Sequence, residues 1–143
     1  MNHDYFKHIF LYIIPLWIIL ISGCKNIGEK EIVIISTNDI HGRIEQFPKL
    51  ATFVERIKTK HPNVILVDAG DRFTGNPYVD HAQEKGLPII SLMNDLGYEI
   101  GTLGNHEFDF GMDNFLEIAD EAQYKYLSCN FTSLETGEPV LDA

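Results

Sequence analysis

The sequence YEIGTLGNHEFD, residues 98–109, joins a strand-like run to a polar turn. Residues 98–103 predict a short buried strand. Gly104 then allows the backbone to turn sharply where that strand ends. The carboxamide, imidazole and two carboxylates that follow are side chains that bind a metal ion or move a proton. The alternative interpretation of this stretch is a polar turn with a surface histidine.

The composition limits the class of protein. The 143 residues carry a formal net charge of -10 and are 45% hydrophobic. This length suits about one domain, and the hydrophobic fraction is sufficient for a core. Nucleic-acid binders normally have a basic face, so we expect no nucleic-acid polymer as a partner. Bound cations would still allow an acidic protein to accept phosphate esters.

The N-terminus predicts an export signal. Residues 9–21 are almost wholly apolar, which suits the core of a signal peptide and is too short for a comfortable membrane span. The sequence LISGC, residues 20–24, resembles the bacterial lipobox. This resemblance implies cleavage before Cys24 and lipid on Cys24, so that residues 1–23 are a lipoprotein signal peptide and 24–30 a tether. We expect a protein lipid-anchored to a bacterial cell membrane, on its periplasmic or cell-surface side; an uncleaved anchor and an ordinary secreted protein are the alternatives.

Strand and helix patterns alternate through the rest of the chain. Four apolar runs predict buried strands at residues 31–36, 64–67, 98–103 and 126–129. Apolar residues at helical spacing predict a helix that begins at Pro48, a second from Pro88 to a stop at Gly97, and a third after Gly111. The alternation predicts an α/β fold, with a mainly parallel β-sheet covered by helices on both faces. Cys129, at the end of the last predicted strand, is interpreted as a small buried residue with no disulfide partner.

Polar side chains follow three of the predicted strands at the point where each strand ends. They are Asp39 and His41, Asp71, and the pair Asn105 and His106. Ligands of parallel sheets bind beyond the carboxyl ends of the strands, so we expect these side chains to meet in space. Asp39 and His41 are two residues apart, which directs both to the same side of an extended backbone.

Three motifs resemble the dinuclear metallophosphoesterases, and within them the 5'-nucleotidase family. They are TNDIHG at residues 37–42, VDAGDRFTG at 67–75 and GNHEFDFG at 104–111, and the likeness extends over nearly all of residues 31–130. The resemblance implies the calcineurin-like phosphoesterase fold, whose domain is a β-sandwich. Residues 31–143 would then be the N-terminal part of such a domain.

The resemblance also implies a metal centre of two divalent ions. Asp39 and His41 would bind the first ion, Asp71 would bridge both, and Asn105 would bind the second. Mixed oxygen and nitrogen ligands suit Zn, Mn or Fe, and the sequence does not separate these metals. Two such ions can hold the attacking and leaving oxygens of an in-line displacement and supply a metal-bound hydroxide.

The implied reaction is hydrolysis of nucleotide phosphomonoesters. His106 would stabilise the transition state or protonate the leaving alcohol, and Asp109 would orient its ring. The expected partners are a nucleotide or another small phosphate ester, and a membrane through the lipid anchor. A 2',3'-cyclic-nucleotide or other phosphodiesterase on the same metal centre is the first alternative.

The chain departs from the family pattern after GNHE. The family takes further metal ligands from downstream histidines, whereas no histidine follows His106 here. The family's C-terminal nucleoside-binding domain is also absent. We therefore expect a truncated gene or a fragment, and the second alternative function is an inactive lipid-anchored fragment.

The remaining polar residues receive modest interpretations. Asn38 and Asp68 are taken as supporting or turn-forming, and Arg43 as either a surface residue or a contact for phosphate. Glu107 belongs to the GNHE motif without assigned chemistry. His61 and His81, which belong to none of the three motifs, are expected to be exposed to solvent.

Overall fold

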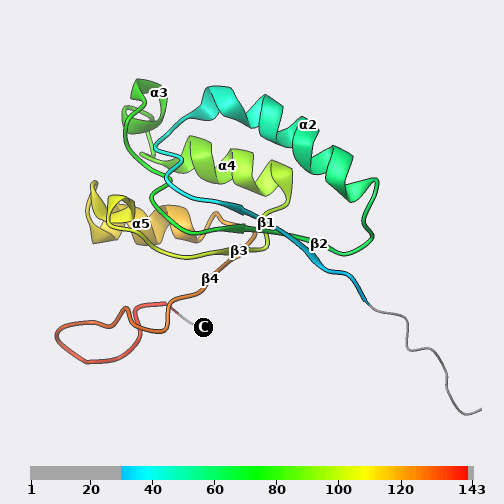
Figure 1. Cartoon of the computed structure of the whole chain (residues 1–143). Helices are drawn as coiled ribbons and strands as arrows, with labels where there is room; N and C mark the ends of the chain where they lie inside the picture. Colours follow the sequence, from blue (N-terminus) through cyan, green and yellow to red (C-terminus); the bar gives the residue numbers. More distant parts are fainter. Residues whose placement is uncertain (1–29, 142–143) are drawn as a thin grey trace, which may run out of the picture. The chain divides into compact units, whose positions relative to one another are not determined.

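Four parallel strands form the sheet of the computed structural model, which describes residues 30–141 (Figure 1). The strands are β1 (Val33–Thr37), β2 (Val64–Asp68), β3 (Ile100–Gly101) and β4 (Lys125–Tyr126), and their order in the sheet is β1-β2-β3-β4. β1 and β2 pair along their full length, from Val33 opposite Val64 to Thr37 opposite Asp68. The predicted signal peptide, most of the tether and Cys24 lie outside the described residues.

Four helices connect or follow these strands. They are α2 (Phe47–Lys58), α3 (Pro77–Asp80), α4 (Leu87–Leu96) and α5 (Met112–Ala119). A proline stands in the first turn of α2 and of α4, and Gly97 ends α4 in the left-handed conformation (φ 75°), as predicted. Two short 3-10 helices lie in loops, η1 (Ile44–Gln46) and η2 (His106–Phe108). Within residues 30–141, no helix is long and apolar enough to cross a membrane.

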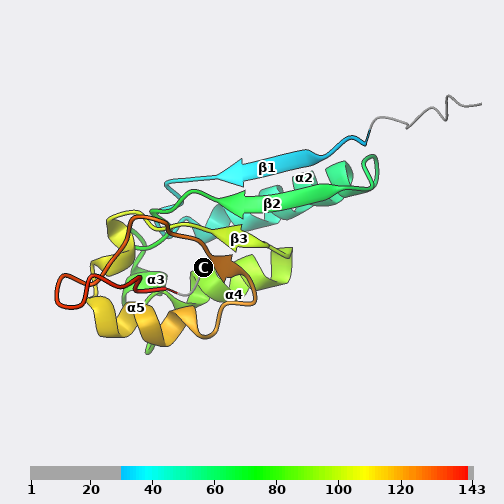
Figure 2. The same cartoon turned by 90° about the horizontal axis from the view of Figure 1, so that it is seen from below.

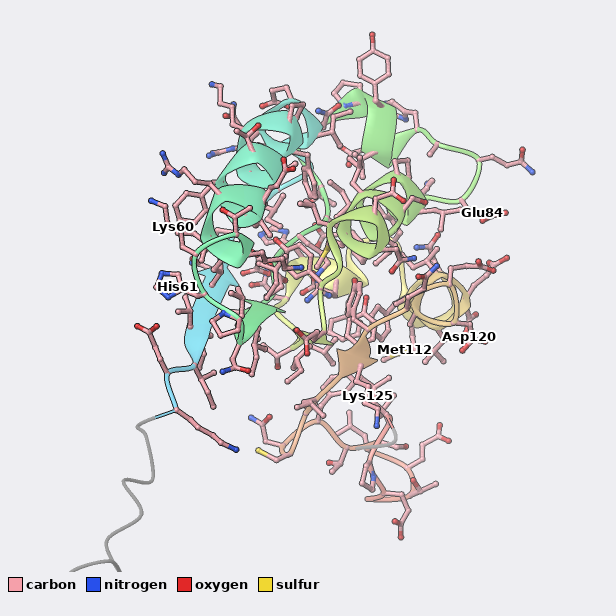
Figure 3. The ribbon with its side chains drawn as sticks, turned by 90° about the vertical axis from the view of Figure 1, so that its right-hand side faces the viewer. Lys60, His61, Glu84, Met112, Asp120 and Lys125 are labelled. Atoms are coloured by element: carbon pink, nitrogen blue, oxygen red, sulfur yellow. The ribbon has the colours of Figure 1, made fainter. Side chains whose placement is uncertain are left out.

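In the described part of the chain, the helices cover one face of the sheet. Figure 2 views the sheet from its open face, with α2 and α4 behind the strands, and Figure 3 shows α5 following α4 on the same side. Neighbouring residues of β1 differ accordingly, since Ile35 is 9% exposed and Ile34 is 65% exposed. The prediction of helices on both faces is therefore wrong for residues 30–141. Sequential parallel strands with right-handed crossovers place every connecting helix on the same face.

The core fills the space between the sheet and its helices. Its fully buried apolar side chains come from β2, from the loop after β2, and from α3, α4 and α5: Leu66, Phe73, Val79, Ile89, Ile90, Met93, Phe115 and Ile118. Three charged residues are buried with them, namely Asp68, Arg72 and Glu107. A buried charge needs a partner, so these three mark a polar network inside the fold.

The last two strands are shorter than predicted. Backbone pairing around β3 and β4 extends only from the Lys125 N–H, which donates to Glu99, to the Leu127 N–H, which donates to Gly101. The chain then leaves the sheet and forms a loop closed by an antiparallel bridge between Thr132 and Pro139 (Figure 1). Cys129 lies in this loop and is exposed, so the prediction of a buried cysteine is wrong.

Candidate metal centre

The loops after β1 and β2 run side by side beyond the sheet. The backbone N–H of Asp39 donates to Gly70 (3.1 Å), and that of His41 donates to Asp71 (3.1 Å). These bonds continue the alignment of β1 with β2 past the ends of both strands. Two predicted metal ligands on one loop are thereby placed next to a third on the other.

These two loops hold the backbone in a conformation that most side chains avoid. Asp39, His41, Asp71 and Thr74 have positive φ angles of 51°, 48°, 57° and 61°. Asp and His tolerate this region moderately well, whereas a β-branched Thr is a true outlier there. Such strain is found mainly at functional sites, where surrounding contacts hold it in place.

The loop after β3 closes against the loop after β2. The Asp71 carboxylate accepts a hydrogen bond from the backbone N–H of His106 (Asp71 Oδ1 to N, 2.9 Å). Gly70 and Gly104 make this approach possible, because a Cβ at Gly70 would lie 2.6 Å from the Gly104 nitrogen. Asp71 therefore contacts the GNHE motif directly, although 35 residues separate it from His106.

Two imidazole rings meet at this edge of the sheet. The ring centroids of His41 and His106 are 4.6 Å apart in an edge-to-face arrangement. His41 Nε2 also lies 3.7 Å from Asp39 Oδ1. Asn105, by contrast, is exposed, and its side chain makes no hydrogen bond to another described residue. The structure thus gathers Asp39, His41, Asp71 and His106, and places Asn105 next to His106 without a side-chain hydrogen bond to any of them.

His106 and Asp109 form the predicted pair. Nδ1 of His106 lies 2.7 Å from Asp109 Oδ2. The hydrogen bond to Asp109 raises the pKa of His106, and the bond to His106, followed by that to Thr74, lowers the pKa of Asp109. The Thr74 hydroxyl donates to Asp109 Oδ2 (2.9 Å) and lies 3.2 Å from His106 Nδ1. The ring of His106 is therefore oriented by two neighbours, of which the sequence predicted only Asp109.

The donor types at this edge suit divalent metal ions. Carboxylate, imidazole and carboxamide groups are ligands of Zn, Mn and Fe. Among residues 30–141, however, no three His, Cys, Asp or Glu side chains stand close enough together to hold a metal ion by themselves. The described residues therefore fit part of a metal shell rather than a complete one.

The sequence analysis gave Asp68 a supporting or turn-forming role, but it assigned none to two other buried residues near this edge, Glu107 and Arg72. Glu107 is buried and accepts hydrogen bonds from backbone N–H groups of its own loop and of the loop after β2. Arg72 is buried beside it and binds Asp68, and the Thr37 hydroxyl donates to Asp68 Oδ2 (2.7 Å). Asp68 and Arg72 are four residues apart, and their opposite charges were the available sign of an ion pair. This spacing does not by itself indicate that both residues are buried.

A hollow of about 310 Å³ adjoins the site. It is lined by the loop after β1 together with η1 and the start of α2, and it includes Asn38, Asp39 and Arg43. A larger hollow of about 660 Å³ lies beside α5 and β4 and contains none of the candidate metal residues. Of these two hollows, only the first is lined by a candidate metal ligand, Asp39.

Comparison with known proteins identifies similar chains. The profile of the calcineurin-like phosphoesterases matches residues 32–140. Human 5'-nucleotidase is 36% identical over 121 residues, which are 72% of this chain and 21% of the human protein. The 2',3'-cyclic-nucleotide 2'-phosphodiesterase/3'-nucleotidase of Yersinia enterocolitica is 28% identical over 142 residues, 86% of this chain and 22% of that protein.

Solved structures show the same fold. The calcineurin-like phosphoesterase YfkN from Bacillus subtilis superposes with a TM-score of 0.67 at 29% identity, covering 77% of this chain and 40% of YfkN. The 5'-nucleotidase precursor of Thermus thermophilus gives a TM-score of 0.65 at 28% identity, covering 69% of this chain and 22% of that one. The chain spans about a fifth of the length of the curated relatives named above.

Proposed function

The chain belongs to the calcineurin-like phosphoesterase family, and on that premise we propose that it carries part of the active site of a nucleotide phosphoesterase. The observation that carries this proposal is the contact of Asp71 Oδ1 with the His106 backbone N–H. It brings a candidate metal ligand to the motif that holds the candidate acid. The names of the relatives, 5'-nucleotidase and cyclic-nucleotide phosphodiesterase/3'-nucleotidase, support nucleotides as the substrate class.

The proposed cofactors are two divalent ions, Zn, Mn or Fe. Asp39, His41, Asp71 and Asn105 would hold them, and other ligands would have to complete the shell. When bound, such ions polarise a phosphoryl group and acidify water. The chain's own contribution would be to hold these donors at one edge of the sheet, three of them (Asp39, His41 and Asp71) at residues with positive φ on hydrogen-bonded loops.

His106 is the proposed proton donor. Its Nδ1 faces Asp109, so Nε2 is the nitrogen left to hold a proton for the leaving oxygen. The raised pKa of His106 keeps more of the ring protonated at neutral pH than an isolated histidine would be. Water supplies the attacking oxygen, and the proton on Nε2 passes to the departing alcohol. Asp109 and Thr74 hold the ring in place for that transfer.

A phosphodiesterase that opens cyclic nucleotides is the second candidate function. It is favoured by the Yersinia enterocolitica relative, whose similarity extends over 86% of this chain. Both reactions use the same donors and the same acid, so substrate choice depends on residues that contact the nucleoside. In the described residues, the hollow beside Asn38 and Arg43 is the place where such contacts would begin.

The proposed location is the outer side of a bacterial cell membrane, through lipid on Cys24. It rests on the sequence LISGC at residues 20–24. Phosphate released there from nucleotides would be available for uptake. We further propose that residues 24–143 alone bind metal weakly and hydrolyse nucleotides negligibly, because the described residues offer only part of a metal shell.

The test uses the protein expressed from its whole gene. It measures phosphate release from AMP and from 2',3'-cyclic AMP, and it measures the amount of bound Mn²⁺ in the same samples. His106→Ala should lower turnover by about 10²–10⁴-fold while bound Mn²⁺ is retained, because only the acid is lost. Asp71→Ala should lose Mn²⁺ and turnover together. Residues 24–143 expressed alone should release almost no phosphate.

Three results would count against these roles. Full Mn²⁺ binding without hydrolysis of either nucleotide would overturn the proposed function. Loss of Mn²⁺ from His106→Ala as complete as that from Asp71→Ala would overturn the division of labour. Strong phosphate release by residues 24–143, abolished by Asp71→Ala, would overturn the proposed inactivity of that part.

A further inference from the structure

Glu107 is a fully buried acidic residue, with 1% of its surface exposed. Its carboxylate accepts three backbone hydrogen bonds. Oε2 accepts from the N–H of Asp71 (3.0 Å) and of Gly104 (2.5 Å), and Oε1 accepts from the N–H of Arg72 (2.9 Å). Both oxygens are therefore occupied as acceptors.

The three donors belong to the two loops that carry candidate metal residues. Asp71 and Arg72 follow β2, whereas Gly104 follows β3 and directly precedes Asn105 and His106. Oε2 of Glu107 bonds both loops at once, through the N–H groups of Asp71 and Gly104. Without it, these N–H groups would be left without a partner in a region largely closed to water.

Arg72 is the buried cation nearest to Glu107, and it is shared with Asp68. Its Nη1 lies 3.7 Å from Glu107 Oε1, and its Nε and Nη2 bind Asp68 Oδ1 at 2.9 Å and 2.7 Å. Nη2 also donates to the Thr102 carbonyl (2.6 Å), which is part of the loop after β3. The buried carboxylate is thus paired and hydrogen-bonded, as a buried charge must be.

We propose that Glu107 is a positioning residue that fixes the distance between Asp71 and the Asn105–His106 pair. It touches neither substrate nor metal, and it acts through the backbone of the residues that do. This inference rests on the proposed function for its consequence in catalysis. The clamp itself, a carboxylate joining two loops, stands on the hydrogen bonds described above.

The chemistry of the clamp requires a carboxylate. A glutamine has one acceptor oxygen, so in either orientation its NH₂ group would face a backbone N–H at Oε1 or Oε2. An aspartate keeps the charge but is shorter by one methylene, which draws it away from at least one loop. Glu107→Gln should therefore loosen the loops with little change in volume, and Glu107→Asp should do so partially.

The experiment has two parts, both on the full chain. The first measures amide hydrogen exchange. The second is a titration with Mn²⁺, in which binding is detected through the paramagnetic broadening of amide signals, a readout that also detects weak binding. In the wild type, the amides of Asp71, Arg72 and Gly104 should be protected nearly as well as those of β2. In Glu107→Gln, these three should exchange about tenfold faster or more. The affinity for Mn²⁺ should fall about 10–100-fold, as is usual when a partner of metal ligands is lost.

Two controls separate positioning from general stability. Glu117→Gln makes the same chemical change at an exposed site on α5 and should alter neither measurement. Ile90→Ala weakens the core at a fully buried residue and should lower the melting temperature without reducing the affinity for Mn²⁺. If Glu107→Gln does not fold, Glu107→Asp and the wild-type exchange rates still decide the question.

Unprotected Asp71, Arg72 and Gly104 amides in the wild type would overturn the clamp. Unchanged Mn²⁺ affinity in Glu107→Gln, with only the melting temperature lowered, would overturn its positioning role. If the wild-type chain binds no Mn²⁺, the proposed metal centre fails, and the exchange rates still decide whether Glu107 joins the two loops.

Discussion

Among the described residues, three of the four non-glycine positions with left-handed backbone are candidate metal ligands, namely Asp39, His41 and Asp71. The fourth, Thr74, contacts the His106–Asp109 pair. Each such residue costs about 1–3 kcal/mol unless its surroundings compensate. Here the compensation comes from backbone bonds between the two loops and from the carboxylate of Glu107. At the scale of single residues, the backbone strain is therefore concentrated at the candidate metal ligands and beside the His106–Asp109 pair.

The His106–Asp109 pair predicts a pH dependence. Because the pKa of folded His106 is raised, the contribution of His106 to stability is complete below the unfolded pKa of about 6.5 and is lost as the pH rises through the folded pKa. Because the pKa of folded Asp109 is lowered, the contribution of Asp109 is present above about 3.9 and is lost as the pH falls through the folded pKa. The pair is therefore most stabilising between these limits.

NMR titration of the His106 ring protons checks this dependence. Asp109→Asn should lower the pKa of His106, because the charged acceptor at Nδ1 is removed. The exposed Asp113→Asn on α5 is the matched control and should leave that pKa unchanged. An identical His106 pKa in the wild type and in Asp109→Asn would show that the pair does not exist in solution.

Much of the candidate site could be located from the sequence, because strand ends are visible in it. Asp39, His41, Asp71 and His106 follow apolar runs, and parallel strands bring their ends to one edge. The hydrogen bond between His106 and Asp109 is present in the structure, while the catalytic roles of both residues stay predictions. Glu107 could not be assigned, because its burial and two of its three donors, the Asp71 and Arg72 N–H groups, arise only when the loop after β2 meets the loop that carries Glu107.

At the scale of elements, β1 shows how one strand serves two environments. Ile35 is buried on the face that the helices cover, whereas Ile34, the residue before it, is exposed. Successive side chains of a strand point to opposite faces of the sheet, so the exposure of two adjacent residues shows whether each face is covered. β2 has the same alternation, with Leu66 and Asp68 buried and the residues between and before them partly exposed.

Paired substitutions in β1 test which face is covered. Ile35→Ala should lower the free energy of unfolding by about 2–5 kcal/mol, since it removes a buried side chain. Ile34→Ala changes the same residue type in the same strand and should cost less than about 1 kcal/mol. Urea unfolding of the two variants measures the difference. Equal losses would mean that the open face is covered in solution.

Helix ends were easier to predict than strand lengths. Pro88 and Gly97 fix the bounds of the second long helix through local backbone geometry, and α4 begins and ends beside them. The extent of a strand depends instead on its partner. Residues 126–129 look strand-like, but no backbone pairing with β3 continues beyond Leu127 in the described part of the chain. Cys129 is exposed for the same reason.

At the scale of the whole molecule, the negative net charge of the chain opposes the binding of an anionic phosphate ester at the candidate metal centre. The chain carries a formal net charge of -10, which repels phosphate esters at a distance. Cations bound at the candidate centre would reverse the field locally. At the proposed centre, binding of a phosphate ester should therefore require the bound metal ions.

The proposed anchor gives a test outside the described residues. Cys24→Ala should release the protein from the membrane fraction or block signal cleavage, because no lipid can be attached. Cys129→Ala is the matched control, since Cys129 lies in an exposed loop and follows no apolar run. A protein with more than one acyl chain should also resist washing with salt. Unchanged membrane retention of Cys24→Ala would rule out the lipid anchor.

The order β1-β2-β3-β4 has a consequence for the time course of synthesis. Each strand pairs with the strand synthesised just before it. When a new strand leaves the ribosome, its pairing partner has therefore already been made. Chains grow by about 5–20 residues per second, which leaves seconds between successive strands, whereas helices and hairpins form in microseconds. Folding of this part can therefore keep pace with translation. The loop that carries Asp71 is synthesised before Glu107 and lacks its hydrogen bonds to Glu107 until that residue has been made. The candidate metal ligands therefore reach their final positions later than β1, β2 and β3, the strands that they follow.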